Sequence, residues 1–125
     1  MSALVNEWIT KGEGDRHTAR RESEVHDAPN WDAVCFHAQQ AVEKYLKALL
    51  QQEKIPISRT HDLTQLLRLL LPLHSDFEAL LTDMEWLTTF AVEIRYPGES
   101  ALEADAKQAV SIMERAITCI RAKFG

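Results

Sequence analysis

The segment spanning residues 31–50 constrains the fold more than any other part of this chain. It reads WDAVCFHAQQAVEKYLKALL, and its apolar residues recur at the i, i+3, i+4, i+7 spacing of one helix face. They are Trp31, Val34, Cys35, Ala38, Ala41, Val42, Tyr45, Leu46 and Leu49. Because a helix with so sharp an apolar stripe must bury it against neighbouring elements, the segment predicts a helix at the centre of a packed core.

Helical periodicity also marks the rest of the chain, and no alternating strand pattern bounded by turns interrupts it. We expect helices over about residues 3–25, 31–52, 61–71, 75–95 and 100–123, the third being shorter than the others. Short connections between long amphipathic helices place neighbours antiparallel. The sequence therefore predicts an all-α fold, an up-and-down antiparallel bundle of four main helices plus a shorter helix.

Prolines and capping residues set the expected helix boundaries. Pro72 stops the third helix, and Pro97 ends the fourth near Arg95 because the residue before a proline avoids helical geometry. Two pairs have the spacing of a capping box, Ser75 with Glu78 and Ser100 with Glu103. We therefore expect the fourth helix to begin at Ser75 and the fifth near Ser100.

Length and charge limit the classes of protein that this chain can be. Its 125 residues predict a single helical domain over 1–125. A net charge of −5 argues against broad binding along a nucleic-acid backbone, but it leaves open a small site for a nucleotide or an RNA end. The sequence has no apolar run of about 20 residues and no signal-peptide pattern, so we expect a cytoplasmic protein with no membrane contact.

Cysteine and histidine spacing gives no sign of a metal centre or another cofactor. Cys35 and Cys119 both fall on apolar helix stripes, so buried thiols outside any disulfide are expected. The five histidines do not pair at metal-ligand spacing on one helix, which favours surface or boundary positions. We expect no metal and no cofactor.

The polar residues with a possible role each have a structural alternative. Glu43, Lys44 and Lys47 edge the apolar stripe, where they fit either a binding edge or a solvated face with a Glu43–Lys47 pair. Arg95, beside the Pro97 turn, could cap the last carbonyls of its helix or bind an anion. The pattern alone does not choose between these roles.

Three segments together resemble the HEPN family (higher eukaryotes and prokaryotes nucleotide-binding domain). They are CFHAQQAVEKYLKALL, RTHDLTQLL and FAVEIRYPGE, in this order and spacing. The resemblance extends over about residues 8–120. It implies an all-α bundle that forms a homodimer and acts with a minimal nucleotidyltransferase, in some members as a toxin–antitoxin pair.

The resemblance also implies where an activity would lie. Many HEPN members are metal-independent RNases with an arginine followed four to six residues later by a histidine. The histidine serves as general acid/base and the arginine stabilises phosphate charge. Arg95 matches the arginine, but the positions for histidine hold Ser100, Ala101 and Leu102. The missing histidine argues against an enzyme and favours the nucleotidyltransferase-associated branch of the family.

The leading hypothesis is therefore a HEPN-domain module that binds a nucleotide or RNA and acts with a nucleotidyltransferase partner. The expected ligand-binding residues are Lys44, Lys47, His61, Glu93, Arg95 and Tyr96. In this hypothesis a lysine and Arg95 hold phosphate, His61 and Glu93 orient it, and Tyr96 stacks on a base or is a modification target. The alternatives are a metal-independent RNase toxin with a degenerate motif and a dimeric interaction bundle without a ligand.

Overall fold

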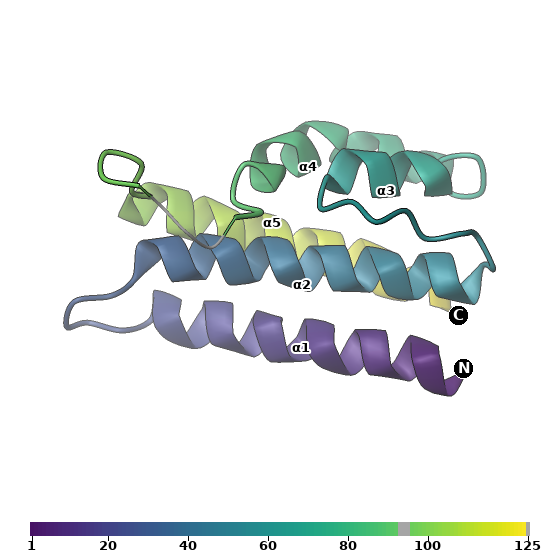
Figure 1. The fold of residues 1–125 in the computed structure, drawn as a ribbon, viewed down its shortest axis with the longest axis horizontal. Coiled ribbons are helices and arrows are strands. Elements are labelled where there is room, and N and C mark those ends of the chain that lie inside the picture. Colours follow the sequence, from purple (N-terminus) through teal and green to yellow (C-terminus); the bar gives the residue numbers. More distant parts are fainter. Residues whose placement is uncertain (93–95, 125) are drawn as a thin grey trace.

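The computed structural model describes residues 1–92 and 96–124, and helices make up most of it (Figure 1). The elements are α1 (Ala3–Ser23), α2 (Trp31–Gln52), α3 (Leu63–Leu70), the 3-10 helix η1 (Ser75–Leu80), α4 (Leu81–Thr88), α5 (Glu103–Arg121) and the 3-10 turn η2 (Ala122–Phe124). No strand occurs among the described residues. The predicted all-α class is confirmed.

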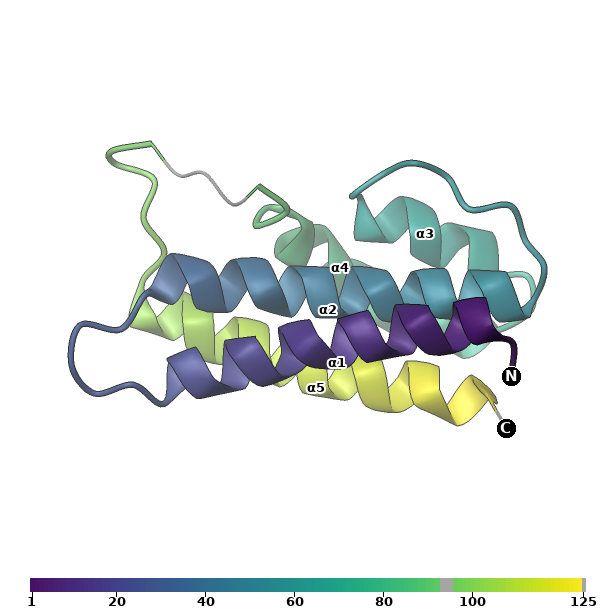
Figure 2. The same ribbon diagram turned by 60° about the horizontal axis from the view of Figure 1, so that its bottom comes forward.

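The long helices lie side by side, with α2 in the middle of the bundle (Figures 1 and 2). Helix α2 contacts α1, α3, α4 and α5. The chain direction reverses from α1 to α2, and again between α4 and α5 (Figure 1). The short α3 is inserted between α2 and α4, after a connection that runs back along α2 (Figure 1). This is the predicted helical bundle, in which both α3 and α4 are short, with eight residues each.

Helix α2 occupies the centre because its apolar stripe is wide. Every stripe residue from Val34 to Leu49 is fully buried, and only Trp31 at the start is partly exposed. The helix begins where the Asn30 side chain accepts a hydrogen bond from Ala33 N at 3.0 Å. A side-chain acceptor at this position satisfies an N–H group that has no partner within the helix. The Asn30 cap sets where α2 begins, and the apolar stripe sets which side of it is buried.

Helices α1 and α2 approach closely at Gly12. A Cβ atom on Gly12 would lie 3.0 Å from Tyr45 Cδ2, so any larger residue would push the ring away. The Tyr45 hydroxyl donates to Glu13 Oε2 at 2.6 Å. Burial raises the pKa of Tyr45 above its ordinary value of 10.0, and the bond to Glu13 raises it further. Gly12, which weakens a helix by its flexibility, therefore makes the contact between these helices possible.

The boundaries around α4 differ from the prediction. The expected helix over 75–95 begins as 3-10 turns and its α-helical part ends at Thr88. The amides of Thr89 and Phe90 bond to carbonyls three residues back, which tightens the chain and closes the helix. Thr88 Oγ1 also accepts from Leu63 N at 3.0 Å, so the end of α4 caps the start of α3.

Both predicted capping boxes are wrong. No side chain caps the start of η1, where Ser75 was expected to do so. Helix α5 begins at Glu103, three residues after Ser100, and at its start Leu102 N donates to Asp105 Oδ2 at 2.9 Å. The S-x-x-E spacing therefore lies close to each helix start but does not identify the residues that form the cap.

Two further predictions concern the cysteines and membrane-spanning helices. Cys35 is buried and outside any disulfide, as predicted, but Cys119 is exposed, because it lies on the side of α5 away from the core. Among the helices that the structure describes, none is long and apolar enough to cross a membrane.

Candidate functional site

A buried carboxylate on α2 gathers the polar side chains that are the strongest candidates for a functional site. The Glu43 side chain is only 4% exposed. It accepts from Lys47 Nζ at 3.0 Å and from Gln39 Nε2 at 3.2 Å. Both of its oxygens lie 3.1 Å from His61 Nδ1. We call these four residues, Gln39, Glu43, Lys47 and His61, the Glu43 cluster.

Helix geometry and one connection assemble the Glu43 cluster. Gln39, Glu43 and Lys47 are successive i, i+4 positions, so they lie above one another on one face of α2. His61 directly precedes Asp62, the residue whose side chain caps α3. Gln39 Nε2 also donates to the His61 carbonyl at 2.9 Å, which fixes the backbone there. The cluster therefore joins α2 to the start of α3.

Lys47 and His61, the two basic residues of the Glu43 cluster, differ in access to solvent. The Lys47 side chain is 10% exposed, and its Nζ lies 5.7 Å from the centroid of the Trp8 ring on α1. The His61 side chain is 70% exposed. Glu43 neutralises Lys47 in the interior, so Lys47 positions the carboxylate and does not contact a ligand directly. His61 is the member that can touch a bound molecule.

The Glu43–His61 contact also fixes what the imidazole can do. An ionised carboxylate only accepts hydrogen bonds, so Nδ1 carries a proton and Nε2 faces outward. A histidine held in this way can accept or donate a proton at Nε2, or hydrogen-bond a phosphate oxygen. The arrangement is that of an oriented acid/base group at a surface.

A second carboxylate, on α1, binds two other polar side chains of α2. Asp15 on α1 bonds to His37 Nδ1 at 2.8 Å and to Lys44 Nζ. All three side chains are partly shielded, with Asp15 12% exposed. We call Asp15, His37 and Lys44 the Asp15 cluster. It ties α1 to α2 and takes Lys44 out of the group formed by Lys47 and His61.

The predicted site residues are thus only partly brought together. Lys47 and His61 meet through Glu43, whereas Lys44 pairs with Asp15. Tyr96 is 69% exposed at the start of the Pro97–Gly98 turn, and over the described chain its side chain makes no hydrogen bond to the Glu43 cluster. Glu93 and Arg95 lie outside the described residues.

The predicted ligand-binding residues did not include Glu43, which is the centre of the cluster. The Glu43–Lys47 pair was expected on a solvated face if it had no function, and the structure buries it. The i, i+4 spacing was visible, but its burial depends on Trp8 and on the segment before α3. Over residues 1–92 and 96–124, no group of three or more histidine, cysteine or acidic residues could hold a metal ion.

The fold and the polar face of α2 place this chain among small all-α bundles, and comparisons identify the family. A family model described as the HEPN domain matches residues 5–123. This chain therefore belongs to the HEPN domain family, as its three sequence segments suggested. A comparison with curated protein sequences finds no match.

Two solved structures share the fold over nearly their whole length. ST0689, described as an archaeal HEPN homologue, is 23% identical with a TM-score of 0.79, covering 99% of this chain and 100% of that one. TT1696 from Thermus thermophilus is 20% identical with a TM-score of 0.76, covering 98% of this chain and 99% of that one. At these identities the likeness establishes the fold alone.

Proposed function

We propose that this HEPN domain is a nucleotide- and partner-binding module that acts with a minimal nucleotidyltransferase. Family membership over residues 5–123 supports the general class. The observation that carries the ligand-binding part is His61, whose exposed ring is held by a buried carboxylate. An imidazole fixed in this way is organised before a ligand arrives, which lowers the entropic cost of binding.

In this proposal the doubly protonated ring of His61 keeps its Nδ1–H on Glu43 and donates from Nε2–H to a phosphate oxygen of the nucleotide. Lys47 holds the Glu43 carboxylate in place behind the ring, and Arg95 supplies the direct charge on the phosphate. Glu93 and Tyr96 belong to the site through the family resemblance, with Tyr96 available to stack on a base. Lys44 has no direct role in this version, because Asp15 already holds it.

Calorimetric titration tests the nucleotide site. Mono-, di- and triphosphates are added to the wild type and to His61→Ala, Arg95→Ala and Arg68→Ala. Arg68, on the exposed side of α3, is the control for loss of one positive charge. We expect each of the first two variants to weaken binding at least tenfold and Arg68→Ala to leave it unchanged. Absence of wild-type binding at millimolar nucleotide would show that the nucleotide part is wrong.

The partner part of the proposal has its own test. A minimal nucleotidyltransferase encoded beside this chain is co-expressed with it, and the mixture is analysed by size-exclusion chromatography with light scattering. We expect a homodimer of this chain that binds the nucleotidyltransferase, and relief of growth inhibition if the two form a toxin–antitoxin pair. Separate elution of the two proteins would reject the partner.

A second candidate function is a metal-independent RNase with a relocated histidine. The observation favouring it is again His61, which offers an oriented proton carrier although none follows Arg95. RNA is incubated with the protein in the presence of a chelator. Cleavage that is lost in His61→Ala but kept in His37→Ala, the other carboxylate-bound histidine, would establish this activity. If the wild type does not cleave RNA, the binding module is favoured. If nucleotides also fail to bind, the bundle without a ligand is favoured.

A further inference from the structure

The connection after α2 begins with a turn in which a lysine occupies a position that favours glycine. Ile55 N donates to the Leu50 carbonyl at 2.9 Å, and Lys54 N donates to the Gln51 carbonyl at 3.2 Å. These two bonds form the Schellman motif that ends many helices. Lys54 has a φ of 59°, in the left-handed region that glycine adopts without steric cost. The turn gains nothing from the lysine side chain, so any role of that side chain lies outside the turn.

The lysine lies at the edge of a small apolar cavity, which has a volume of about 350 Å³. The lining residues are Gln51, Lys54, Ile55, Pro56 and Ile57. Leu73, which is 57% exposed, belongs to the same end of the bundle, because the adjacent His74 Nε2 lies 3.0 Å from Glu53 Oε1 (Figure 1). An apolar cavity with an exposed leucine at the same end of the bundle is suited to receive an apolar side chain of a partner.

The charges of the same connection are used unequally within the protein. Of its two acids, Glu53 binds His74, and Asp62 caps α3 with its side chain. Its two permanently charged bases, Lys54 and Arg59, are exposed, and over the described residues neither side chain makes an ion pair or a hydrogen bond. Unmatched positive charge therefore accompanies the apolar cavity, in a chain whose net charge is −5. We call the residues that line the cavity, together with Arg59 and Leu73, the Lys54 surface.

We propose that the Lys54 surface docks an acidic segment of a protein partner. One large apolar side chain of the segment enters the cavity, and its flanking carboxylates bind Lys54 and Arg59. Carboxylates form charge-assisted hydrogen bonds with both cations, and a buried anchor side chain supplies much of the affinity of such a contact. The hydrogen-bonded turn shapes the cavity before the partner arrives, which lowers the entropic cost of docking. This inference goes beyond the proposed function, because the surface contains no member of the Glu43 cluster and requires no nucleotidyltransferase.

The composition of the Lys54 surface favours a protein segment over a membrane or a nucleic acid. Polybasic surfaces that bind anionic lipids carry about four to eight lysines or arginines, whereas Lys54 and Arg59 are the two here. A nucleic-acid backbone offers phosphates and sugars but no side chain to fill the cavity, so Leu73 and the isoleucines would stay in solvent. An acidic segment matches both features, because carboxylates and apolar side chains can follow one another along one chain.

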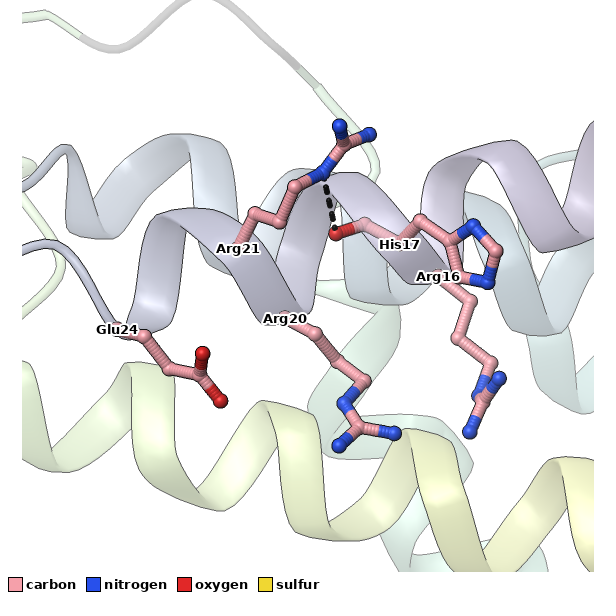
Figure 3. A pocket seen from close by; sticks show the side chains of 5 residues that line it. All are labelled: Arg16, His17, Arg20, Arg21 and Glu24. Carbon is pink, nitrogen blue, oxygen red and sulfur yellow. Dashed lines mark hydrogen bonds between the residues drawn. The ribbon is translucent and has the colours of Figure 1, made fainter.

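A second cavity, at the last turns of α1, provides a control for charge alone. Its lining side chains are Arg16, His17, Arg20, Arg21 and Glu24, none of which is apolar (Figure 3). Arg20 lies at the opposite end of the bundle from Lys54 and makes no hydrogen bond to the other side chains drawn there (Figures 1 and 3). Arg20→Glu therefore reverses one exposed positive charge without touching the Lys54 surface.

Peptide selection followed by fluorescence anisotropy tests the Lys54 surface. Random peptides displayed on phage are selected on the immobilised full chain, and the enriched peptides are synthesised with a fluorescent label. We expect these peptides to combine a large apolar residue with acidic neighbours. Replacing the apolar residue with alanine, or the acids with their amides, should each weaken binding about tenfold. Enrichment of peptides without acidic residues, or of none, would contradict the proposal.

Variants of the lysine separate docking from stability. Lys54→Glu should weaken binding of the selected peptides about tenfold, whereas Arg20→Glu should leave their affinity unchanged. Lys54→Gly should also weaken binding, while its melting temperature equals or exceeds that of the wild type, because glycine adopts the left-handed turn without cost. Equal weakening by Lys54→Glu and Arg20→Glu, or full affinity in Lys54→Gly, would overturn the site.

Other occupants of the Lys54 surface have outcomes of their own. Vesicles that contain phosphatidylserine and a single-stranded RNA are each titrated with the wild type and with Lys54→Glu, and light scattering after size-exclusion chromatography gives the mass of both proteins. We expect none of these results to depend on Lys54. Vesicle or RNA binding that Lys54→Glu abolishes, with no acidic peptide selected, would replace the protein segment by that ligand. A wild-type dimer that becomes monomeric in Lys54→Glu would instead make the occupant a second copy of this chain.

Discussion

The two carboxylate clusters on the polar face of α2 have the same chemistry but different surroundings. In each, one carboxylate accepts from a lysine and from Nδ1 of a histidine. In the Asp15 cluster all three side chains are partly shielded between α1 and α2, and the histidine is part of α2 itself. In the Glu43 cluster the carboxylate and lysine are buried, but His61 comes from the segment before α3 and stands in solvent.

This difference shows that the type of side chain does not decide its role. His37 is enclosed by the helix pair that it joins, so its bond to Asp15 stabilises the α1–α2 contact. His61 is tied down at one nitrogen and open at the other, so its bond to Glu43 prepares the ring for a ligand. A histidine supplied by a connection rather than by a packed helix is the feature that distinguishes a candidate site from a cross-link.

The largest expected effect comes from removing the buried carboxylate. Glu43→Gln leaves the Lys47 ammonium buried without its counter-charge, and breaking a buried ion pair costs roughly 3–5 kcal/mol. Urea denaturation monitored by tryptophan fluorescence measures this loss. The double variant Glu43→Gln with Lys47→Met should recover most of it, because no unpaired charge then remains. A loss below about 1 kcal/mol would mean that the Glu43–Lys47 pair contributes no more than an exposed ion pair does, despite its burial.

A smaller loss is expected for the corresponding change in the Asp15 cluster. Asp15→Asn removes the charge that Lys44 and His37 share, but Lys44 can turn its ammonium to water. The cost should be about 2 kcal/mol, near the value of a charge-assisted hydrogen bond. Parallel urea curves for Asp15→Asn and Glu43→Gln give the comparison directly. A loss for Asp15→Asn that equals or exceeds the other would reverse the ranking by burial.

The central part of the fold was predictable from the sequence because it is encoded locally. The periodicity of α2 fixes which of its residues are apolar and on one face, and Val34 to Leu49 are buried as that pattern requires. The antiparallel pairing of α1 with α2 follows from the short connection between them, and the family resemblance follows from three segments in order. None of these inferences needs a distance between residues remote in the chain.

The composition of the site was less predictable because it depends on such distances. His61 reaches Glu43 only because the connection after α2 returns along that helix and Gln39 binds the His61 carbonyl. Lys44 was placed in the site by its position beside Lys47, but its place on the helix face brings it to Asp15 instead. The end of α4 was misplaced for a similar reason, since Thr88 bonds to the first amide of α3.

The Glu13–Tyr45 bond is a reference for the two clusters, because its donor is a neutral hydroxyl. Tyr45→Phe should cost about 1.5 kcal/mol near neutral pH, the low end for a hydrogen bond to a charged group and less than either charged pair. The variant keeps the ring against Gly12, so packing is preserved. Thermal denaturation at a series of pH values measures the difference from wild type.

The pH dependence of that difference has a definite sign. Burial alone raises the pKa of Glu13, but the hydrogen bond from Tyr45 and the charge of Arg16 outweigh it, so its pKa lies below the ordinary 4.5. The stability that the Glu13–Tyr45 bond contributes is therefore present above pH 4.5 and is lost as the pH falls through the lowered pKa of Glu13. The pKa of Tyr45 is raised, so wild type also loses stability as the pH rises above 10.0. The gap between wild type and Tyr45→Phe should therefore narrow at both ends, and a constant gap would contradict the bond.

The smallest effect on stability, and the sharpest separation of the clusters, is expected for the two histidines. His61→Ala should change the free energy of unfolding by no more than about 0.5 kcal/mol, because its ring is largely in solvent. His37→Ala removes a shielded ring from the α1–α2 contact and should cost more. If His61→Ala nevertheless abolishes nucleotide binding and His37→Ala does not, stability and function are divided between the two clusters. A large loss of stability in His61→Ala would make its bond to Glu43 a cross-link as well.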